Sequence, residues 1–245
     1  YKKIIAALDI KKDDIIVEVG PGLGTLTGYL AESKARIIAV EKDKKLAIYL
    51  KNKFSNRKNV KIIEGDILKF NPGNYQLHTT NYKLVGNIPY YLSSHLIRTV
   101  FEKWPRSETI VLMLQKEVAQ RIVAKPPDMS LLAVSVQYYS KPEIISYVSR
   151  NSFYPAPEVD SAIIKLETQN LELKTNEVKN FFKVVRAGFA GKRKQLANNL
   201  TAGLKISKQE IRQKLTLIDI DPQRRAETLT IEEWQRITNF LFSQG

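Results

Sequence analysis

Four consecutive residues near the middle of the chain, Asn87-Ile88-Pro89-Tyr90, carry groups that could hold a planar ring bearing an amine. The amide oxygen of Asn87 and the carbonyl of Ile88, which precedes a proline, are hydrogen-bond acceptors, and Tyr90 offers a flat stacking surface. Residues 82–85 have strand composition, so the four residues are expected at the carboxyl end of a strand, where open α/β sheets bind ligands. The same residues could instead simply set the turn into the following helix.

A glycine-rich turn near the start of the chain has the spacing of a nucleotide-cofactor site. Residues 14–19 have the pattern of a buried parallel strand, Gly20-Pro-Gly22-Leu-Gly24 follows, and a helical pattern begins at Thr25. Glycines at such a turn let the backbone approach a ligand closely. A dinucleotide fingerprint would need Gly or Ala where this chain has Thr25, so the spacing favours a cofactor without a phosphate.

Acidic residues close the next two strand-like runs. Glu41 ends residues 36–41 and could accept hydrogen bonds from both hydroxyls of a ribose. Asp66 follows residues 60–64 and could accept from the exocyclic amine of adenine while Ile67 packs on the ring, although Asp66 could also simply cap a helix. With Gly20 and Asn87, four consecutive strands then present a candidate ligand contact at their carboxyl ends.

The middle of the chain continues the alternation of helices and strands. Ser93 is expected to cap a helix that includes residues 96–104, and further helices are predicted at 115–124 and 131–139, with strands at 109–114, 144–148 and 162–166. Two prolines in the loop 151–161 would hold Phe153 in a fixed place, unless that ring only packs beneath the loop. Glu117 and Arg121 lie on one helical face and could touch RNA or pair with each other.

Beyond a polar stretch at 167–175 the periodicity is purely helical, which predicts two domains, 1–169 and 170–245. Thr230 and Glu233 have the spacing of a capping box. Residues 170–245 carry fourteen Lys and Arg against eight Asp and Glu, and the basic residues include Lys192-Arg193-Lys194 and, one helix earlier, Arg186. These four residues predict a surface for a polyanion, but a charge run can equally be a solvated face.

Composition narrows the class of protein. The 245 residues include 43% hydrophobic residues and a net charge of +14, which points to a polyanionic partner. Without cysteine there are no disulfides, thiolate zinc sites or Cys nucleophile, and two widely separated histidines predict no metal site. Because no apolar run approaches 18 residues and no signal peptide is visible, we expect an intracellular protein without a membrane span.

Taken together, these residues resemble the ribosomal RNA adenine-N6 dimethyltransferases, and most closely the branch that acts on the small ribosomal subunit. The combination of Asn-Ile-Pro-Tyr with the loop Phe-x-Pro-x-Pro-x-Val-x-Ser is highly specific. The resemblance covers essentially the whole chain, through residues 17–27, Glu41, 65–66, 86–90, 114–118, 153–161, 186–189, 192–196, 199–200 and 225–227.

The resemblance implies an α/β, class I Rossmann-like methyltransferase fold, with a seven-stranded, mostly parallel sheet and a small C-terminal all-helical domain. The implied activity is transfer of methyl groups from S-adenosyl-L-methionine to N6 of two adjacent adenines near the 3′ end of small-subunit rRNA in a pre-30S-like particle. We expect a cytoplasmic, or if eukaryotic an organellar, monomer. The implied roles are catalysis by Asn87, Ile88, Pro89, Tyr90 and Phe153, cofactor binding by Gly20, Gly22, Glu41, Asp66, Ile67 and Asn87, and RNA binding by Arg186, Lys192, Arg193 and Lys194.

Two other functions stay open at this point. Large-subunit rRNA methyltransferases of the antibiotic-resistance type share the Asn-Ile-Pro-Tyr loop, although the C-terminal segments resemble the small-subunit branch. A non-catalytic RNA-binding assembly or transcription factor could use the same fold, although the retained Gly20, Glu41, Asp66 and Asn87 argue against it. The chain also lacks the family's basic N-terminal segment and the stretch that closes over the cofactor, so we expect residues before Tyr1. The turn at 125–129 is shorter than the family's and lacks its usual Gly, through natural trimming or a gap.

Overall fold

The computed structural model describes residues 1–77, 82–88, 92–169 and 175–242. The chain forms two compact units, each made of two segments. The first comprises Tyr1–Gln120 and Ser140–Gln169, and the second comprises Arg121–Tyr139 and Asn170–Gly245. The helical unit therefore contains residues 121–139 in addition to the predicted C-terminal segment.

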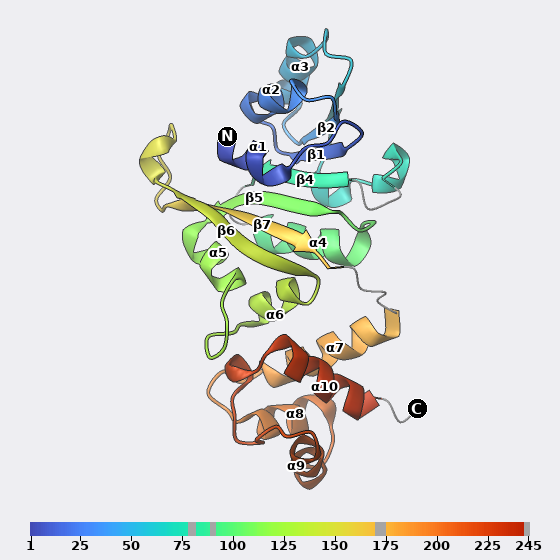
Figure 1. Cartoon of the computed structure of the whole chain (residues 1–245), viewed down its shortest axis with the longest axis vertical. Coiled ribbons are helices and arrows are strands. Elements are labelled where there is room, and N and C mark those ends of the chain that lie inside the picture. The colour runs from blue at the N-terminus through green and yellow to red at the C-terminus, as the bar shows by residue number, and fades with distance from the viewer. Residues whose placement is uncertain (78–81, 89–91, 170–174, 243–245) are drawn as a thin grey trace. The chain divides into compact units, whose positions relative to one another are not determined.

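The first unit is built on one sheet, which has seven strands within the described residues (Figure 1). Its spatial order is β3-β2-β1-β4-β5-β7-β6. Strands β3, β2, β1, β4 and β5 pair in parallel, while β7 is antiparallel to both β5 and β6. The predicted seven-stranded, mostly parallel sheet is thus confirmed. The strands are β1 (Ile15–Val19), β2 (Arg36–Glu41), β3 (Val60–Glu64), β4 (Tyr82–Asn87), β5 (Thr109–Gln115), β6 (Ser140–Val148) and β7 (Ser161–Thr168).

Helices connect these strands. One face of the sheet is covered by α1, whose Ile4 and Leu8 are buried in the same cluster as Val85, Val111 and Met113 of the central strands. The helices that lie in or begin in this unit are α1 (Lys2–Leu8), α2 (Thr25–Ala31), α3 (Lys44–Lys53), α4 (Ser93–Lys103) and α5 (Lys116–Ile122), with short 3-10 turns at Ile67–Lys69, Pro72–Tyr75 and Arg150–Ser152.

The predicted cap of α4 is wrong. The residue before the helix is Leu92, whose backbone is already helical, and Ser93 lies inside the first turn. Ser93 is buried, and within the described part of the chain its hydroxyl has no hydrogen-bond partner. A side chain can cap a helix only from a residue with non-helical backbone angles just outside the first turn, and Ser93 does not occupy that place.

A buried ion pair ties the sheet to the turn before β1. Lys83 on β4 is 1% exposed, and its ammonium lies 2.8 Å from a carboxylate oxygen of Asp14. It also donates to the backbone oxygen of Asp9 at 2.6 Å. The same Asp14 oxygen accepts from the backbone N–H of Lys11 at 2.7 Å. Burial of two charges is tolerated here because they are paired and hydrogen-bonded.

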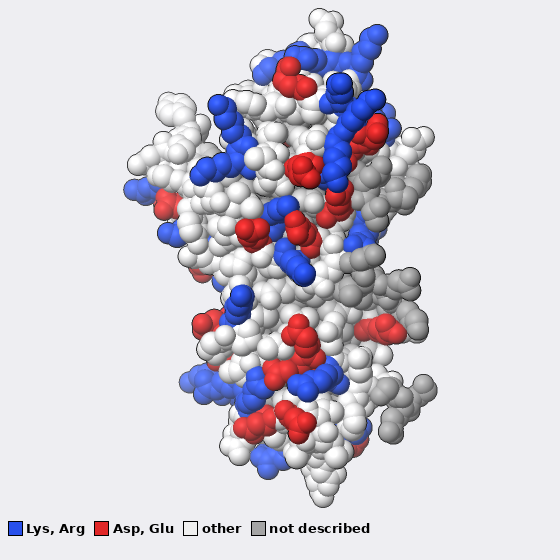
Figure 2. All heavy atoms as spheres, in the orientation of Figure 1, with Lys and Arg blue, Asp and Glu red and all other residues white. Residues whose placement is uncertain are grey.

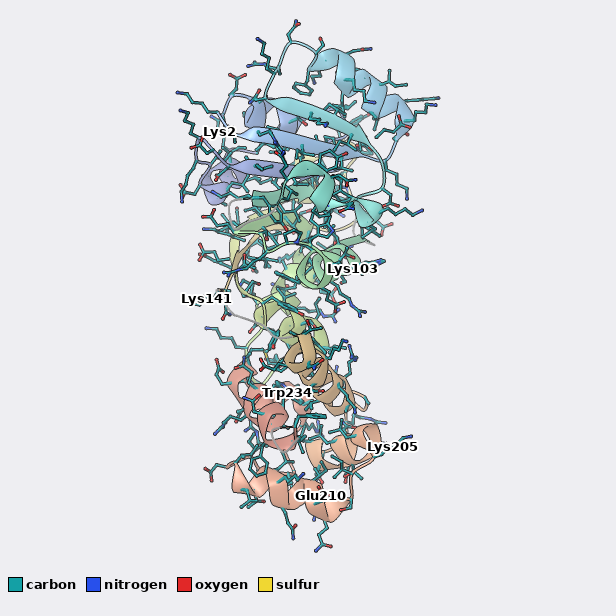
Figure 3. All side chains as sticks on the ribbon, turned by 90° about the vertical axis from the view of Figure 1, so that its right-hand side faces the viewer. Lys2, Lys103, Lys141, Lys205, Glu210 and Trp234 are labelled. Carbon is teal, nitrogen blue, oxygen red and sulfur yellow. The ribbon has the colours of Figure 1, made fainter. Side chains whose placement is uncertain are left out.

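The second unit is helical within the described residues. Its core contains Trp234, which is fully buried and lies so close to Gly188 that a Cβ atom there would collide with the indole ring (Figure 3). Tyr138 stacks on Phe181 with ring centroids 4.0 Å apart, which attaches the segment 121–139 to the C-terminal helices. The helices are α6 (Leu131–Gln137), α7 (Thr175–Gly188), α8 (Leu196–Leu204), α9 (Lys208–Leu217) and α10 (Ile231–Phe242), with a 3-10 turn at Ala226–Thr228.

The predicted capping box at the start of α10 is confirmed. The Thr230 hydroxyl accepts from the backbone N–H of Glu233 at 3.2 Å, and the Glu233 carboxylate accepts from the backbone N–H of Thr230 at 2.8 Å. Across the residues that can be described, no helix has the length and apolar character needed to cross a membrane.

Candidate active site at the carboxyl ends of the parallel strands

The strand register places the main candidate residues on one face of one edge. Glu18 of β1 is paired with Ala39 of β2 on one side and with Val85 of β4 on the other. Laterally paired residues of parallel strands point to the same face, and so do residues two apart. Glu41 and Asn87, each two residues beyond those partners, therefore share the face of Glu18. This is also the face that α1 covers further down the strands.

The glycine turn after β1 leaves open space beside two of its glycines. Gly20 and Gly22 have φ angles of +62° and +59°, a conformation that other residues rarely adopt, and no described atom lies within 4 Å of a Cβ built on either. Gly24 differs, because a Cβ there would lie 2.6 Å from Leu50 of α3. Gly24 is therefore needed for packing, whereas a ligand can approach the backbone at Gly20 and Gly22.

Glu41 binds the glycine turn to the end of β2. It is 7% exposed, and its two oxygens accept from the backbone N–H groups of Gly22 at 3.0 Å and Asp43 at 2.9 Å. A carboxylate has about four acceptor positions, so two remain for a ligand. The side chain thus fixes the shape of the turn while it keeps acceptor capacity at the edge of the sheet.

Glu18 is a further residue of the candidate active site, and it was not predicted from the sequence. It is 1% exposed, and within the described residues its Oε2 atom has no hydrogen-bond partner. Burial raises the pKa of Glu18 to about 7, the nearby Glu41 carboxylate adds to the rise, and Thr27 opposes it. The signal was an acid inside an otherwise apolar strand, two residues before the first glycine of the turn.

Asp66 and Ile67 lie at the next strand end. One Asp66 oxygen accepts from the backbone N–H of Leu68 at 3.0 Å, so the capping alternative is observed, for a 3-10 turn. The other oxygen lies 3.2 Å from the ammonium of Lys42. The Leu68 N–H lowers the pKa of Asp66, and Lys42 adds to this effect. Ile67 is buried. The carboxylate is therefore ionised and partly exposed, and a contact with adenine stays a prediction.

The predicted catalytic loop is described only in part. Asn87 is the last residue of β4 and is exposed, and among the described residues its side chain makes no hydrogen bond. The Ile88 side chain is buried. Pro89 and Tyr90 lie outside the described residues. Phe153 is half-buried and packs against the core cluster that includes Ile163. Part of its side chain therefore packs in the core, as the alternative to a stacking role predicts.

The four predicted RNA-binding residues belong to the second unit. Arg186 is in the last turn of α7, and Lys192, Arg193 and Lys194 follow it, all of them exposed. In the part of the chain that is described, none of the four has an acidic partner. Beneath them Asn199, which is 3% exposed, donates to the backbone oxygens of Gly188 at 2.6 Å and Gly191 at 2.9 Å. These two hydrogen bonds fix the backbone of the basic turn, residues 188–194.

The overall positive charge does not form one continuous surface on every side of the molecule. On the face that Figure 2 draws, Lys and Arg side chains are interspersed with Asp and Glu side chains. A polyanionic partner would therefore bind local basic clusters such as residues 192–194.

Among the side chains that the structure describes, no group of three or more His, Cys, Asp or Glu could hold a metal ion.

The chain matches a known protein family over nearly its whole length. The profile of the family described as "Ribosomal RNA adenine dimethylase" matches residues 1–243. A ribosomal RNA small subunit methyltransferase A from Dehalococcoides mccartyi is 46% identical over 96% of this chain and 81% of that protein. Its counterpart from Alkaliphilus metalliredigens is 37% identical over 96% and 84%.

Two solved structures share the fold over nearly their whole length. A dimethyladenosine transferase from Plasmodium falciparum superposes with a TM-score of 0.84 at 28% identity, covering 96% of this chain and 92% of that one. The 23S rRNA methyltransferase ErmE superposes with a TM-score of 0.78 at 25% identity, covering 98% and 95%. The class I methyltransferase fold is thus established for this chain.

Proposed function

Because this chain belongs to the ribosomal RNA adenine dimethylase family, we propose that it methylates N6 of two adjacent adenines near the 3′ end of small-subunit rRNA. The observation that carries this proposal is the side-chain amide of Asn87, which is exposed and lies on the same edge of the sheet as the open glycine turn. Among the described residues this amide has no hydrogen-bond partner. The relatives at 46% and 37% identity, which are named for the small subunit, support the choice of RNA. We expect a cytoplasmic monomer that acts on a pre-30S-like particle.

The cofactor in this proposal is S-adenosyl-L-methionine, which when bound supplies a methyl group on a positively charged sulfur. Gly20 and Gly22 fit it because their backbone is accessible, and Glu41 keeps free acceptor positions for the ribose hydroxyls. Asp66, whose carboxylate is ionised, would accept from the adenine amine, and Ile67 would pack on the ring. Asn87 would contact the methionine part as well as the substrate.

Asn87 and Ile88 would act on the amine that is methylated. The lone pair of an adenine N6 amine is delocalised into the ring, which makes the amine a poor nucleophile. If Asn87 Oδ1 and the Ile88 carbonyl accept the two N–H groups, the nitrogen turns toward a tetrahedral form, and its lone pair points at the methyl group. Catalysis would then consist of positioning and electrostatics without a strong base.

The remaining predicted residues would hold the RNA. Pro89 would restrict the backbone angles of Ile88 and so the direction of its carbonyl, and Tyr90 and Phe153 would stack on the flipped base. Arg186, Lys192, Arg193 and Lys194 would bind phosphates from the C-terminal domain, residues 170–245, which we regard as the RNA-binding domain. The exposure of all four side chains supports this role.

The similarity to ErmE keeps one alternative, methylation of an adenine in large-subunit rRNA. The test is to incubate the protein with radiolabelled S-adenosylmethionine and either pre-30S particles or large-subunit rRNA, and to map the methylated nucleotides. We expect dimethylation of two adjacent adenines near the 3′ end of the small-subunit RNA. Asn87→Ala is the control for an activity that belongs to this site. Methylation confined to large-subunit RNA would refute the proposal.

A further inference from the structure

A groove of about 420 Å³ opens beside the candidate active site, and the proposed function leaves it without a role. One wall is formed by residues 115–117 and Gln120, where β5 ends and α5 begins. The other wall is formed by Arg150 and residues 158–160, which belong to the connection between β6 and β7. All of these residues belong to the first unit.

The wall of the groove at Gln115 lies next to Asn87, on the same face of the sheet. Asn87 is paired with Met113 of the neighbouring strand β5, and Gln115 is two residues further along that strand. One strand spacing and two residues amount to a separation on the order of 8 Å between their backbones. Two nucleotides that follow one another in a single strand can therefore reach both places.

The walls of the groove are braced by hydrogen bonds. Asp160 accepts from the backbone N–H of Arg150 at 3.0 Å, and the Arg150 guanidinium donates to the backbone oxygen of Glu158 at 3.3 Å. The backbone N–H of Lys116 donates to the backbone oxygen of Asp160 at 3.0 Å, which joins the two walls. The groove is thus a formed feature of the fold.

The polar groups of the groove suit a base better than a phosphate. Lys116 and Arg150 are outnumbered by the three carboxylates of Glu117, Glu158 and Asp160, although the protein as a whole carries +14. A phosphate would be repelled by this excess of negative charge. In the described structure the side chains of Gln115, Gln120, Glu117 and Glu158 have no hydrogen-bond partner. They supply acceptors for the exocyclic amine of a base, and the glutamines supply donors for its ring nitrogens.

An exposed aromatic ring lies beside Lys116, on the face of the sheet opposite Gln115. The ammonium of Lys116 lies 5.3 Å from the ring centroid of Tyr147, and Tyr147 is 52% exposed. Unstacked bases in single-stranded RNA are commonly bound by stacking on exposed aromatic or guanidinium groups together with hydrogen bonds to their edges. The groove itself supplies the hydrogen-bonding groups, whereas Tyr147 lies outside its lining.

We propose that this groove binds the base next to the target adenine, and that it prefers a base whose exocyclic amine still carries its N–H groups. The inference rests on the proposed function. A dimethylated amine has no N–H to donate, so a groove rich in acceptors would bind an unmodified adenine better than a dimethylated one. The groove would therefore influence which of the two adjacent adenines is completed first.

The test is a cycle that combines a protein change with a base change. The groove variant is Gln120→Ala with Glu158→Ala, two exposed side chains without partners among the described residues. The matched control is Gln213→Ala with Glu143→Ala, which removes the same groups from positions outside the groove. The substrates are pre-30S particles with either adenine or purine, which lacks the amine, at the position next to the target. Single-turnover methylation of the target adenine is measured at subsaturating particle concentration and saturating S-adenosylmethionine.

We expect removal of the neighbouring amine to slow wild type and the control variant about ten-fold, the usual cost of removing one hydrogen bond to a base, and to slow the groove variant less than two-fold. An equal reduction in all three proteins, or no reduction in wild type, would overturn the inference. Glu158→Gln, a nearly isosteric change, should weaken the same coupling and guards against misfolding of the double variant. If wild type methylates no adenine of these particles, the proposed function itself fails.

Discussion

Replacing Glu18 with Gln should stabilise the first unit at neutral and alkaline pH. The rise in the pKa of Glu18 from 4.5 to about 7 corresponds to about 3 kcal/mol, at about 1.36 kcal/mol for each pKa unit. Because the folded pKa lies above the unfolded one, the fold favours the protonated acid. The penalty is absent below pH 4.5, grows as the pH rises from 4.5 to 7, and is complete above 7. Gln carries no charge, so the variant should be more stable by up to about 3 kcal/mol at pH 8.

The measurement must report on β1 alone, because the two units need not unfold together. Wild type, Glu18→Gln and the control Glu64→Gln, an exposed acid at the end of β3, would be equilibrated in urea between pH 5 and pH 8. A pulse of hydrogen exchange at one fixed pH then measures the unfolded fraction of the peptide that contains β1. If Glu18→Gln is no more stable than wild type at pH 8, or if its advantage is the same at pH 5, the reasoning from burial is refuted.

Three further predictions concern the roles proposed for the site and the basic turn. Glu41→Ala should weaken S-adenosylmethionine binding by about 1.5–3 kcal/mol, roughly ten- to a hundred-fold, because it removes the proposed charge-assisted hydrogen bond to the ribose as well as the bond from Gly22. Unchanged calorimetric affinity would contradict this. Asn87→Ala should slow single-turnover methylation by about 10²- to 10³-fold at saturating cofactor and RNA, while the affinity for RNA stays within a few-fold of wild type. A wild-type rate would mean that Asn87 only sets the turn. When Lys192, Arg193 and Lys194 are all replaced with alanine, the plot of log affinity for rRNA against log salt concentration should become shallower by about 0.7–0.9 for each phosphate that is no longer bound, while cofactor binding stays the same. An identical slope would mean that these side chains are only solvated.

The features that were predictable from sequence are those that depend on near neighbours. The glycine turn, the strand ends at Glu41 and Asn87, and the capping box of Thr230 and Glu233 follow from local turn chemistry and periodicity. Ser93 was misassigned because capping depends on the backbone angles of Leu92, which a sequence pattern does not contain. Glu18 was missed because one acid hardly disturbs an apolar strand pattern, and its raised pKa appears only once the strand is buried.

The division of the chain depends on distant partners and was predictable only in part. The polar stretch after residue 167 marks the start of the C-terminal helices, but periodicity cannot say that 121–139 joins them. That assignment depends on Tyr138 packing against Phe181, which lies far along the sequence on α7. The groove beside β5 was likewise hidden, because Gln115 and Glu158 meet only through the antiparallel return of β7.

The attachment of residues 121–139 to the later helices has a consequence for how the chain folds as it is synthesised. When residue 169 has emerged from the ribosome, every strand of the first unit is available, but Tyr138 still lacks the ring on which it stacks. The face of Tyr138 that stacks on Phe181 stays uncovered until α7 has emerged. A nascent chain at that stage therefore exposes aromatic surface that the finished protein buries, which is the kind of surface that chaperones bind.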